Sequence, residues 1–235
     1  DLVDRLYYSL DYFGSSEYTR SRNPTTLPSY PPFHMQIFLD TANLDEIRHA
    51  ARLGVLDGVT TNPSIAAKEG ISDLAGYKKA VLEIVDIVGS SVSAEVVSSR
   101  ASEMIDEGRE IASWSKSVVV KIPSTIDGLE AIAALADSGI RVNQTLCFSV
   151  NQAILGANAG ATYVSPFVGR LDDEGHDGMS LVSDIVKVFN TYSIATKVLA
   201  ASIRGPLHCI EAAKAGAHIA TLPYKVLLQM MHHPL

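Results

Sequence analysis

The feature that most constrains the fold of this sequence is an alternation of strand and helix patterns, which repeats eight times from Met35 onward. Each apolar run has the length and β-branched composition of a buried parallel strand, and the stretch behind it spaces its apolar residues at helical intervals. In the first unit, Asn43 and Glu46 form a capping-box signature and Gly54 ends the helix. We predict strands at residues 36–40, 58–61, 92–96, 118–123, 140–146, 162–165, 197–202 and 218–221.

Eight such units of about 25 residues each have the size and rhythm of an α/β fold of the (β/α)8 TIM barrel type. A doubly wound open sheet is the alternative, but it usually carries a glycine-rich nucleotide turn. Neither GxGxxG nor GxxxxGK[ST] occurs in the sequence. We therefore predict a single barrel over residues 35–235, preceded by an extension over residues 1–34. That extension is rich in tyrosine and proline and is expected to be poorly ordered or an added lead-in.

Composition narrows the class of protein. A hydrophobic content of 47% with 19% charged residues is that of an ordinary globular protein. A net charge of -7 and a pI near 5.4 argue against nucleic acid or an anionic membrane as partner. The two cysteines, Cys147 and Cys209, have no CxxC spacing, which favours reduced thiols and a cytoplasmic location. We find no apolar run of about eighteen residues and no signal peptide, so no membrane span is predicted.

Polar residues follow the predicted strands at their carboxyl ends, where the active sites of such barrels lie. Any one of them taken alone would more often serve a loop or a helix cap. Their convergence on one end of a barrel instead indicates a catalytic or binding site. The candidates are Asp40, Thr61, Asn62, Glu95, Lys121, Asn143, Thr145, Ser165, Arg170, Ser202 and Arg204.

Lys121 is the most unusual of these residues, because the strand around it, residues 118–123, is otherwise apolar. Burial disfavours a charged ammonium group, and a neutral amine can attack a carbonyl to form a Schiff base. Asp40 and Glu95 are then the carboxylates for the proton transfers, directly or through a water held by Thr145. The alternative is a structural lysine that pairs with a carboxylate on the next strand or reaches solvent.

Two arginines suggest a phosphate site. Arg170 and Arg204, together with Ser202, offer hydrogen-bond donors late in the barrel, where phosphate sites often form. The alternative for both arginines is a surface ion pair with Asp172 or Asp173.

Two further polar clusters are discounted as metal sites. The acidic run at residues 172–177 lies in a polar loop expected over residues 169–178, lacks the spaced pattern of a calcium loop and is more typical of a solvated turn. His232 and His233 would point to different faces of a helix, whereas paired histidine ligands prefer i, i+4 spacing. No metal is predicted.

Five ordered motifs lie at spacings that a barrel allows: Phe38-Leu39-Asp40-Thr41-Ala42-Asn43, Gly58-Val59-Thr60-Thr61-Asn62-Pro63-Ser64, Val120-Lys121-Ile122-Pro123, Ser165-Pro166-Phe167-Val168-Gly169-Arg170 and Ala201-Ser202-Ile203-Arg204. Together they resemble the transaldolases, in the short bacterial and archaeal subfamily that also holds the fructose-6-phosphate aldolases. The resemblance runs from Met35 to Leu235. It implies a mechanism without a cofactor, in which a dihydroxyacetone unit passes from a ketose phosphate to an aldose phosphate.

The same resemblance implies roles for individual residues. Lys121 would form the Schiff base, Asp40 would be the acid/base for carbon–carbon cleavage, and Glu95 with Thr145 would hold the catalytic water. The expected substrate-binding residues are Thr61, Asn62, Asn143, Ser165 and Phe167, with Arg170, Ser202 and Arg204 at the phosphate.

The resemblance also bears on the product and the assembly. Aldolases of the family have Gln where this chain has Glu95 and Tyr where it has Phe167, so a transaldolase is preferred. The alternatives are a fructose-6-phosphate aldolase that releases free dihydroxyacetone, and a non-catalytic barrel that binds sugar phosphates. Relatives form homo-oligomers, pentamers or decamers, and continue into a carboxyl-terminal helix that is expected to be missing here.

Overall fold

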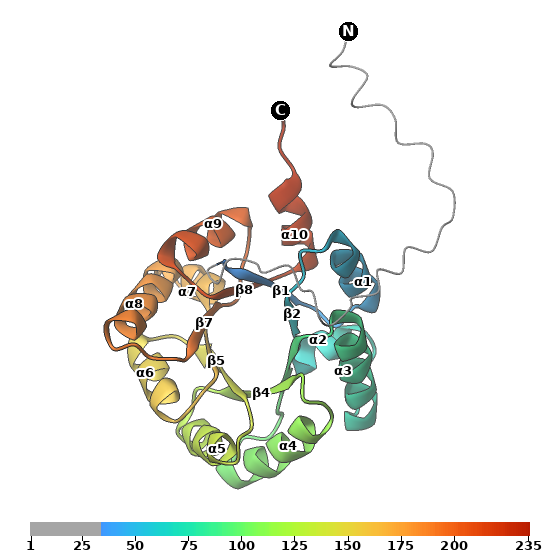
Figure 1. Cartoon of the computed structure of the whole chain (residues 1–235), viewed down its shortest axis with the longest axis vertical. Helices are drawn as coiled ribbons and strands as arrows, with labels where there is room; N and C mark the ends of the chain where they lie inside the picture. The colour runs from blue at the N-terminus through green and yellow to red at the C-terminus, as the bar shows by residue number, and fades with distance from the viewer. Residues whose placement is uncertain (1–33) are drawn as a thin grey trace, which may run out of the picture. The chain divides into compact units, whose positions relative to one another are not determined.

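The computed structural model describes residues 34–235, whose strands close into a barrel of eight parallel strands in sequence order (Figure 1). Closure is made by β1 and β8, where Phe38 is in register with Thr221. This arrangement confirms the predicted (β/α)8 TIM barrel. The predicted extension lies outside the described residues except for His34. The strands are β1 Gln36–Asp40, β2 Gly58–Thr60, β3 Ser91–Glu95, β4 Val118–Pro123, β5 Val142–Cys147, β6 Tyr163–Pro166, β7 Lys197–Ala200 and β8 Ile219–Leu222.

Helices surround the strands in Figure 1 and cover their outward faces. Polar caps start several of them; for example, the side chain of Asn43 accepts hydrogen bonds from the backbone N–H groups of Asp45 and Glu46. No helix within residues 34–235 is long and apolar enough to cross a membrane. The helices are α1 Leu44–Leu53, α2 Pro63–Lys68, α3 Leu74–Val88, α4 Ala101–Ser113, α5 Ile126–Asp137, α6 Val150–Asn158, α7 Val168–Asp173, α8 Gly178–Thr191, α9 Pro206–Ala215 and α10 Tyr224–Met231.

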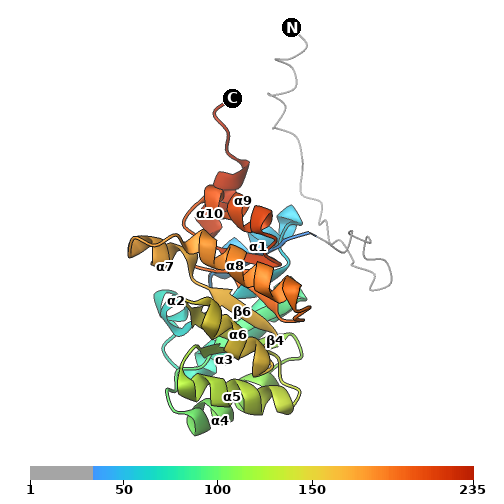
Figure 2. The same cartoon turned by 90° about the vertical axis from the view of Figure 1, so that its left-hand side faces the viewer.

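Two short helices were not predicted, and both follow the carboxyl ends of strands. Helix α2 starts with Pro63 behind the cap Asn62, and helix α7 occupies part of the segment 169–178 that was predicted to be a loop. The loop prediction was wrong because α7 has no side-chain cap and its first N–H groups, those of Val168 and Gly169, bond to carbonyl oxygens of residues 201 and 202. Figure 2 shows α2 and α7 at the same end of the barrel.

Alternation along the strands divides the core into two parts. Outward-facing residues pack against the helices, whereas a smaller set of inward-facing residues fills the interior of the barrel. The ring of Phe38 takes the space above Gly58, where an added Cβ would lie 2.5 Å from the ring. We call the inward set the lumen cluster; its members are Phe38, Val119, Tyr163, Leu199, Ala201 and Ile219.

Candidate active site

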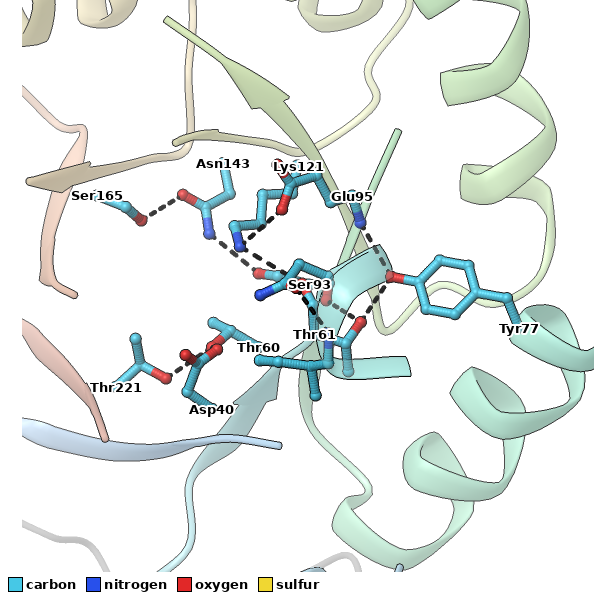
Figure 3. A network of polar contacts seen from close by, with 12 residues as sticks. Asp40, Thr60, Thr61, Tyr77, Ser93, Glu95, Lys121, Asn143, Ser165 and Thr221 are labelled. Atoms are coloured by element: carbon cyan, nitrogen blue, oxygen red, sulfur yellow. Dashed lines mark hydrogen bonds and ion pairs between the residues drawn. The ribbon is translucent and has the colours of Figure 1, made fainter. Parts of the chain in front are cut away.

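Lys121 lies inside the barrel beside Glu95, its register partner on β3 (Figure 3). The Nζ atom of Lys121 lies 3.0 Å from Oε2 of Glu95 and 3.4 Å from the carbonyl oxygen of Thr61. Only 6% of the lysine side chain and 17% of the glutamate side chain are exposed. Burial weakens hydration of both charges, so each is held by its partner. Lys121 therefore forms the ion pair with the neighbouring strand that was the alternative to a reactive amine. The same contact places a proton acceptor, the Glu95 carboxylate, next to the amine.

Asn143 is held in one orientation by neighbours on both sides. Its amide nitrogen donates to Oγ of Ser93 at 3.1 Å, and its amide oxygen accepts from Oγ of Ser165 at 2.6 Å. All three side chains are buried, and Asn143 is in register with Lys121. Figure 3 shows this chain running past the lysine amine. It presents a fixed set of hydroxyl and amide groups at the carboxyl end of the barrel.

Asp40 is bound by two threonines that the sequence analysis did not select. Oγ1 of Thr60 donates to Oδ1 of Asp40 at 2.7 Å and lies 2.7 Å from Oγ1 of Thr221. A hydroxyl has one proton, so the donation from Thr60 to Asp40 requires Thr221 to donate to Thr60. Both threonines occupy inward positions of β2 and β8. Thr60 precedes the selected Thr61 by one residue, and Thr221 is the last residue of the predicted strand 218–221.

Thr61 and Tyr77 form a buried support behind this site. Oγ1 of Thr61 donates to the carbonyl of Ser93 at 2.9 Å, so the hydroxyl of Tyr77 must donate to Thr61, at 2.7 Å. The Tyr77 oxygen in turn accepts from the backbone N–H of Glu95 at 3.1 Å. Burial raises the pKa of Tyr77 to about 12, which keeps the donating proton in place. Tyr77 was not among the candidates, because its spacing with the neighbouring apolar residues is only that of the buried face of a helix.

Thr145 lies on β5, and Phe167 follows directly after β6. Thr145 is fully buried, and its hydroxyl has no hydrogen-bond partner within residues 34–235. An unpaired buried hydroxyl is costly, so it suits a position where a water or substrate group binds. The ring of Phe167 makes an edge contact with Phe148, and the guanidinium of Arg170 lies 5.0 Å from its centre. Phe167 therefore offers a ring and no hydroxyl.

The predicted phosphate ligands Arg170, Ser202 and Arg204 follow the carboxyl ends of β6 and β7, and the N–H of Gly169 bonds to the carbonyl oxygen of Ser202. Arg204 pairs with Asp173, both side chains being 56% exposed, which is the ion pair weighed as the alternative. Arg170 is exposed beside Phe167. Ser202 is half-buried in the left-handed region, with φ 58°.

Asn62 and the acidic run serve local structure. The side-chain oxygen of Asn62 accepts from the N–H of Ile65 as the cap of α2, which leaves its NH2 group for other partners. In the run 172–177, Asp172 accepts from the N–H of Gly178 and pairs with His208, and Asp177 caps α8. These contacts agree with interpreting the run as a structural turn.

Residues 37–235 match the protein family described as Transaldolase/Fructose-6-phosphate aldolase. The chain belongs to this family. The resemblance that the motifs suggested is thereby confirmed over almost the whole barrel.

Relatives within the transaldolase/fructose-6-phosphate aldolase family are similar along most of their length. A protein of Dehalococcoides mccartyi named "Probable transaldolase" is 59% identical over 202 residues, which cover 86% of this chain and 92% of that protein. A protein of Shouchella clausii with the same name is 55% identical over 201 residues, covering 86% and 91%. These names support a transferase of the transaldolase kind.

One solved structure shares the fold at much lower identity. It is described as "Structure of a cube-shaped, highly porous protein cage designed by fusing symmetric oligomeric domains". Its TM-score is 0.56 at 17% identity, covering 82% of this chain and 63% of that chain. Likeness at this identity supports the barrel fold alone.

Proposed function

We propose that this chain is a transaldolase in which Lys121 forms a Schiff base with a ketose phosphate. It would move a dihydroxyacetone unit from sedoheptulose 7-phosphate or fructose 6-phosphate to an aldose phosphate, an exchange of the pentose phosphate pathway. The observation that carries this proposal is the buried contact of 3.0 Å between the Lys121 amine and Glu95. A lysine at that depth, with a carboxylate ready to accept its proton, has the setting of an amine nucleophile.

The reaction follows from these groups without a cofactor. Once the Lys121 ammonium has passed a proton to Glu95, the amine attacks the ketone carbon, and the carbonyl oxygen leaves as water. The bond between C3 and C4 then breaks, its electrons move to the iminium nitrogen, the C4 hydroxyl gives its proton to Asp40, and the fragment from C4 onward leaves as an aldose phosphate. The resulting enamine attacks the acceptor aldehyde, Asp40 returns the proton, and water releases the new ketose and the amine.

The hydrogen bonds around Asp40 and Thr145 suit these proton transfers. Thr60 and Thr221 donate in series toward Asp40, which orients the carboxylate and leaves its second oxygen free to accept a proton. The unpaired hydroxyl of Thr145 is a ready partner for the water that leaves and returns. Asn143 and Ser165 supply an amide and a hydroxyl for the sugar.

Phosphate binding would require Arg204 to exchange its partner. In the structure its guanidinium pairs with Asp173 at the surface, where an ion pair contributes little to stability. A phosphate dianion offers more acceptor oxygens and more charge than a carboxylate. We propose that the donor phosphate takes Arg204 from Asp173 and binds Arg170 and Ser202 as well.

Transaldolase is preferred to aldolase because of Glu95 and Phe167. Phe167 brings no hydroxyl to the water pocket, and its ring is held between Phe148 and Arg170. With one donor fewer for the water, the enamine would persist until an acceptor aldehyde arrives.

A homo-oligomer in the cytoplasm is the proposed state of the protein, with residues 35–235 as its one barrel domain. Exposed apolar side chains on two adjacent helices would suit contacts between copies. Both cysteines are free, as in a reducing compartment. The apolar side chains are Leu207, Ile210, Leu228 and Met231.

Reductive trapping tests the proposal directly. Full-length protein is mixed with fructose 6-phosphate and sodium borohydride, digested, and analysed by mass spectrometry. We expect a reduced adduct of the donor on the peptide that contains Lys121, and none on the Lys121→Met variant. A wild-type protein without an adduct at Lys121 would contradict both the transaldolase and the aldolase, and would leave the non-catalytic barrel.

Omitting the acceptor separates the two enzyme activities. With fructose 6-phosphate alone, a transaldolase releases glyceraldehyde 3-phosphate only up to about one equivalent per site. Continued release of glyceraldehyde 3-phosphate and free dihydroxyacetone would identify an aldolase. Addition of erythrose 4-phosphate should restore steady turnover if the chain is a transaldolase.

A further inference from the structure

The amino-terminal end of the barrel holds a cavity of about 340 Å³, at the opposite end of the strands from Lys121. Its volume is at the lower end of the range for small-molecule sites, about 300 to 1,000 Å³. None of its residues belongs to the candidate active site. It is lined by Gln36, Phe38, Ser90, Ser91, Lys116, Ser117, Arg141, Tyr163 and Lys197.

Strand alternation explains why polar side chains meet there. Gln36 precedes Phe38 by two residues, and Lys197 precedes Leu199 by two, so both share the inward direction of the lumen cluster. Tyr163 on β6 is in register with Lys197, and its hydroxyl lies 3.3 Å from Oγ of Ser91 across the barrel. The alternation that turns side chains inward at the carboxyl-terminal end of the strands therefore also turns side chains inward at their amino-terminal end.

The cavity is positively charged although the chain as a whole carries a net charge of -7. Three of its lining residues are cations, Lys116, Arg141 and Lys197, and no carboxylate is among the lining residues. Neither lysine makes an ion pair with any residue in the described range 34–235. The Arg141 guanidinium donates to the carbonyl oxygen of Lys116 at 2.6 Å, which fixes one edge and leaves the other edge free.

Two neighbours support this picture of the local charge. Asp57, just before β2, does not line the cavity, and its carboxylate accepts from the backbone N–H of Ile37. His218 next to the cavity has a pKa lowered from its ordinary value, by burial first and by the charge of Lys197 second. Among the lining residues of the cavity, no carboxylate offsets the charge of Lys197.

We propose that this cavity binds a small polyvalent oxyanion, a phosphate-bearing metabolite, held by Lys116, Arg141 and Lys197. Tyr163 and Ser91 supply neutral hydroxyl donors at its floor. Three cations without carboxylate partners attract such an ion, and the planar guanidinium matches the oxygen geometry of phosphate. The lumen cluster separates the anion from Lys121, so this is a binding site and takes no part in bond breaking.

Pyrophosphate is the probe for the test, measured by isothermal titration calorimetry on the full chain. The background variant carries Arg170→Ala and Arg204→Ala, which removes the phosphate ligands proposed for the active site. We expect one pyrophosphate per chain to bind this variant. Adding Lys116→Met and Lys197→Met should weaken binding at least tenfold, because Met keeps most of the side-chain length and removes the charge.

The matched control adds Lys214→Met to the same background, since Lys214 is an exposed lysine on α9 that does not line the cavity. It should leave the affinity within twofold. No binding to the background variant, or an equal loss with Lys214→Met, would overturn the proposal and identify non-specific attraction. Failure of the Schiff-base trapping experiment would leave this result unaffected, because no ligand of the cavity is a proposed catalytic residue.

Hydrogen exchange on the same background variant gives a second readout that needs no further substitution. Pyrophosphate bound at the proposed place should slow exchange in the backbone around Ser117 and Lys197 of the Arg170→Ala/Arg204→Ala background. Slowing confined to the carboxyl-terminal loops would place the anion elsewhere and contradict the site.

Discussion

The two ends of this barrel handle positive charge in different ways. At the carboxyl-terminal end, the one buried lysine of the described chain, Lys121, contacts a carboxylate and lies inside a closed set of hydrogen bonds. At the amino-terminal end, Lys116 and Lys197 are exposed and have no carboxylate partner within the described range. A buried cation must be paired because its desolvation is costly, whereas a cation at a rim keeps its water. The contrast suggests that a lysine buried beside a carboxylate suits a reacting amine. Exposed cations without a carboxylate partner instead suit an anion-binding site.

The largest effect should come from removing the buried amine. Lys121→Met is expected to lower kcat about 10³-fold or more, since no other group can form the Schiff base. The matched substitution at the other end, Lys197→Met, should leave kcat unchanged. Steady-state assays with fructose 6-phosphate and erythrose 4-phosphate measure both. Similar activities for the two variants would break the distinction between the ends.

The second-largest effect is expected from the hydrogen bonds of Tyr77 to Thr61 and to the backbone of Glu95, behind Lys121. Tyr77→Phe leaves the N–H of Glu95 without its acceptor and removes the donor to the Thr61 oxygen, which should cost about 1–3 kcal/mol in the free energy of unfolding. We also expect kcat to fall about tenfold, because Glu95 and the reacting amine would be less well positioned. This corresponds to an activation free energy that is higher by about 1.4 kcal/mol. Urea unfolding and kinetics are the measurements.

Tyr192 is the control for this substitution, because its side chain is exposed and its hydroxyl lies outside the site. Tyr192→Phe should alter neither quantity. A Tyr77→Phe enzyme that loses stability but keeps full kcat would reduce Tyr77 to a packing residue.

The rim of the carboxyl-terminal end should respond in KM. Arg204→Ala is expected to raise KM for fructose 6-phosphate about tenfold with little change in kcat, as for loss of one charge-assisted hydrogen bond. Asp173→Asn should act in the opposite direction and lower KM by up to about fivefold, because it frees Arg204 from a surface ion pair. Asp184→Asn, at an exposed carboxylate on α8, is the control. A rise in KM with Asp173→Asn would remove Arg204 from the phosphate site.

The smallest effect concerns pH and the amino-terminal end. The folded protein lowers the pKa of His218 below 6.5, so below pH 6.5 the unfolded chain takes up a proton that the folded chain resists. The contribution of His218 therefore leaves stability unchanged above pH 6.5 and lowers it as the pH decreases below that value. Lys197→Met should raise the pKa of His218 and make that fall smaller. Urea midpoints at pH 7.5 and 5.5 measure it; an equal fall in both proteins would deny the influence of Lys197.

Much of the fold could be predicted from local patterns. The strands and the principal helices follow from runs of β-branched residues, caps and glycines, and the order of motifs predicted the family. Helix α7 could not be predicted, because its first N–H groups bond to Ala201 and Ser202, more than thirty residues ahead in the chain. Contacts that join distant segments leave no local signature.

The candidate site was predictable to the extent that it follows strand ends. Lys121, Glu95, Asn143 and Asp40 meet where their strands end, and their roles stay predictions. Thr60 and Thr221 were passed over, although Thr60 lies next to Thr61 and Thr221 ends the predicted strand 218–221. A strand boundary that is one residue off reverses which of two neighbouring residues faces inward, so the sequence did not single them out. Tyr77 was hidden because a helix position at apolar spacing does not show that its hydroxyl reaches a strand.

The packing of Phe38 over Gly58 has a consequence for engineering this barrel. The Phe38 ring and the rest of the lumen cluster separate an amino-terminal compartment, the cavity described above, from a carboxyl-terminal compartment that holds Lys121. A Cβ at residue 58 would collide with the Phe38 ring. A dye, an affinity handle or a regulatory ligand attached at the amino-terminal compartment would not obstruct substrate entry at the other. The two compartments could be redesigned independently, provided that the glycine and the ring are kept together.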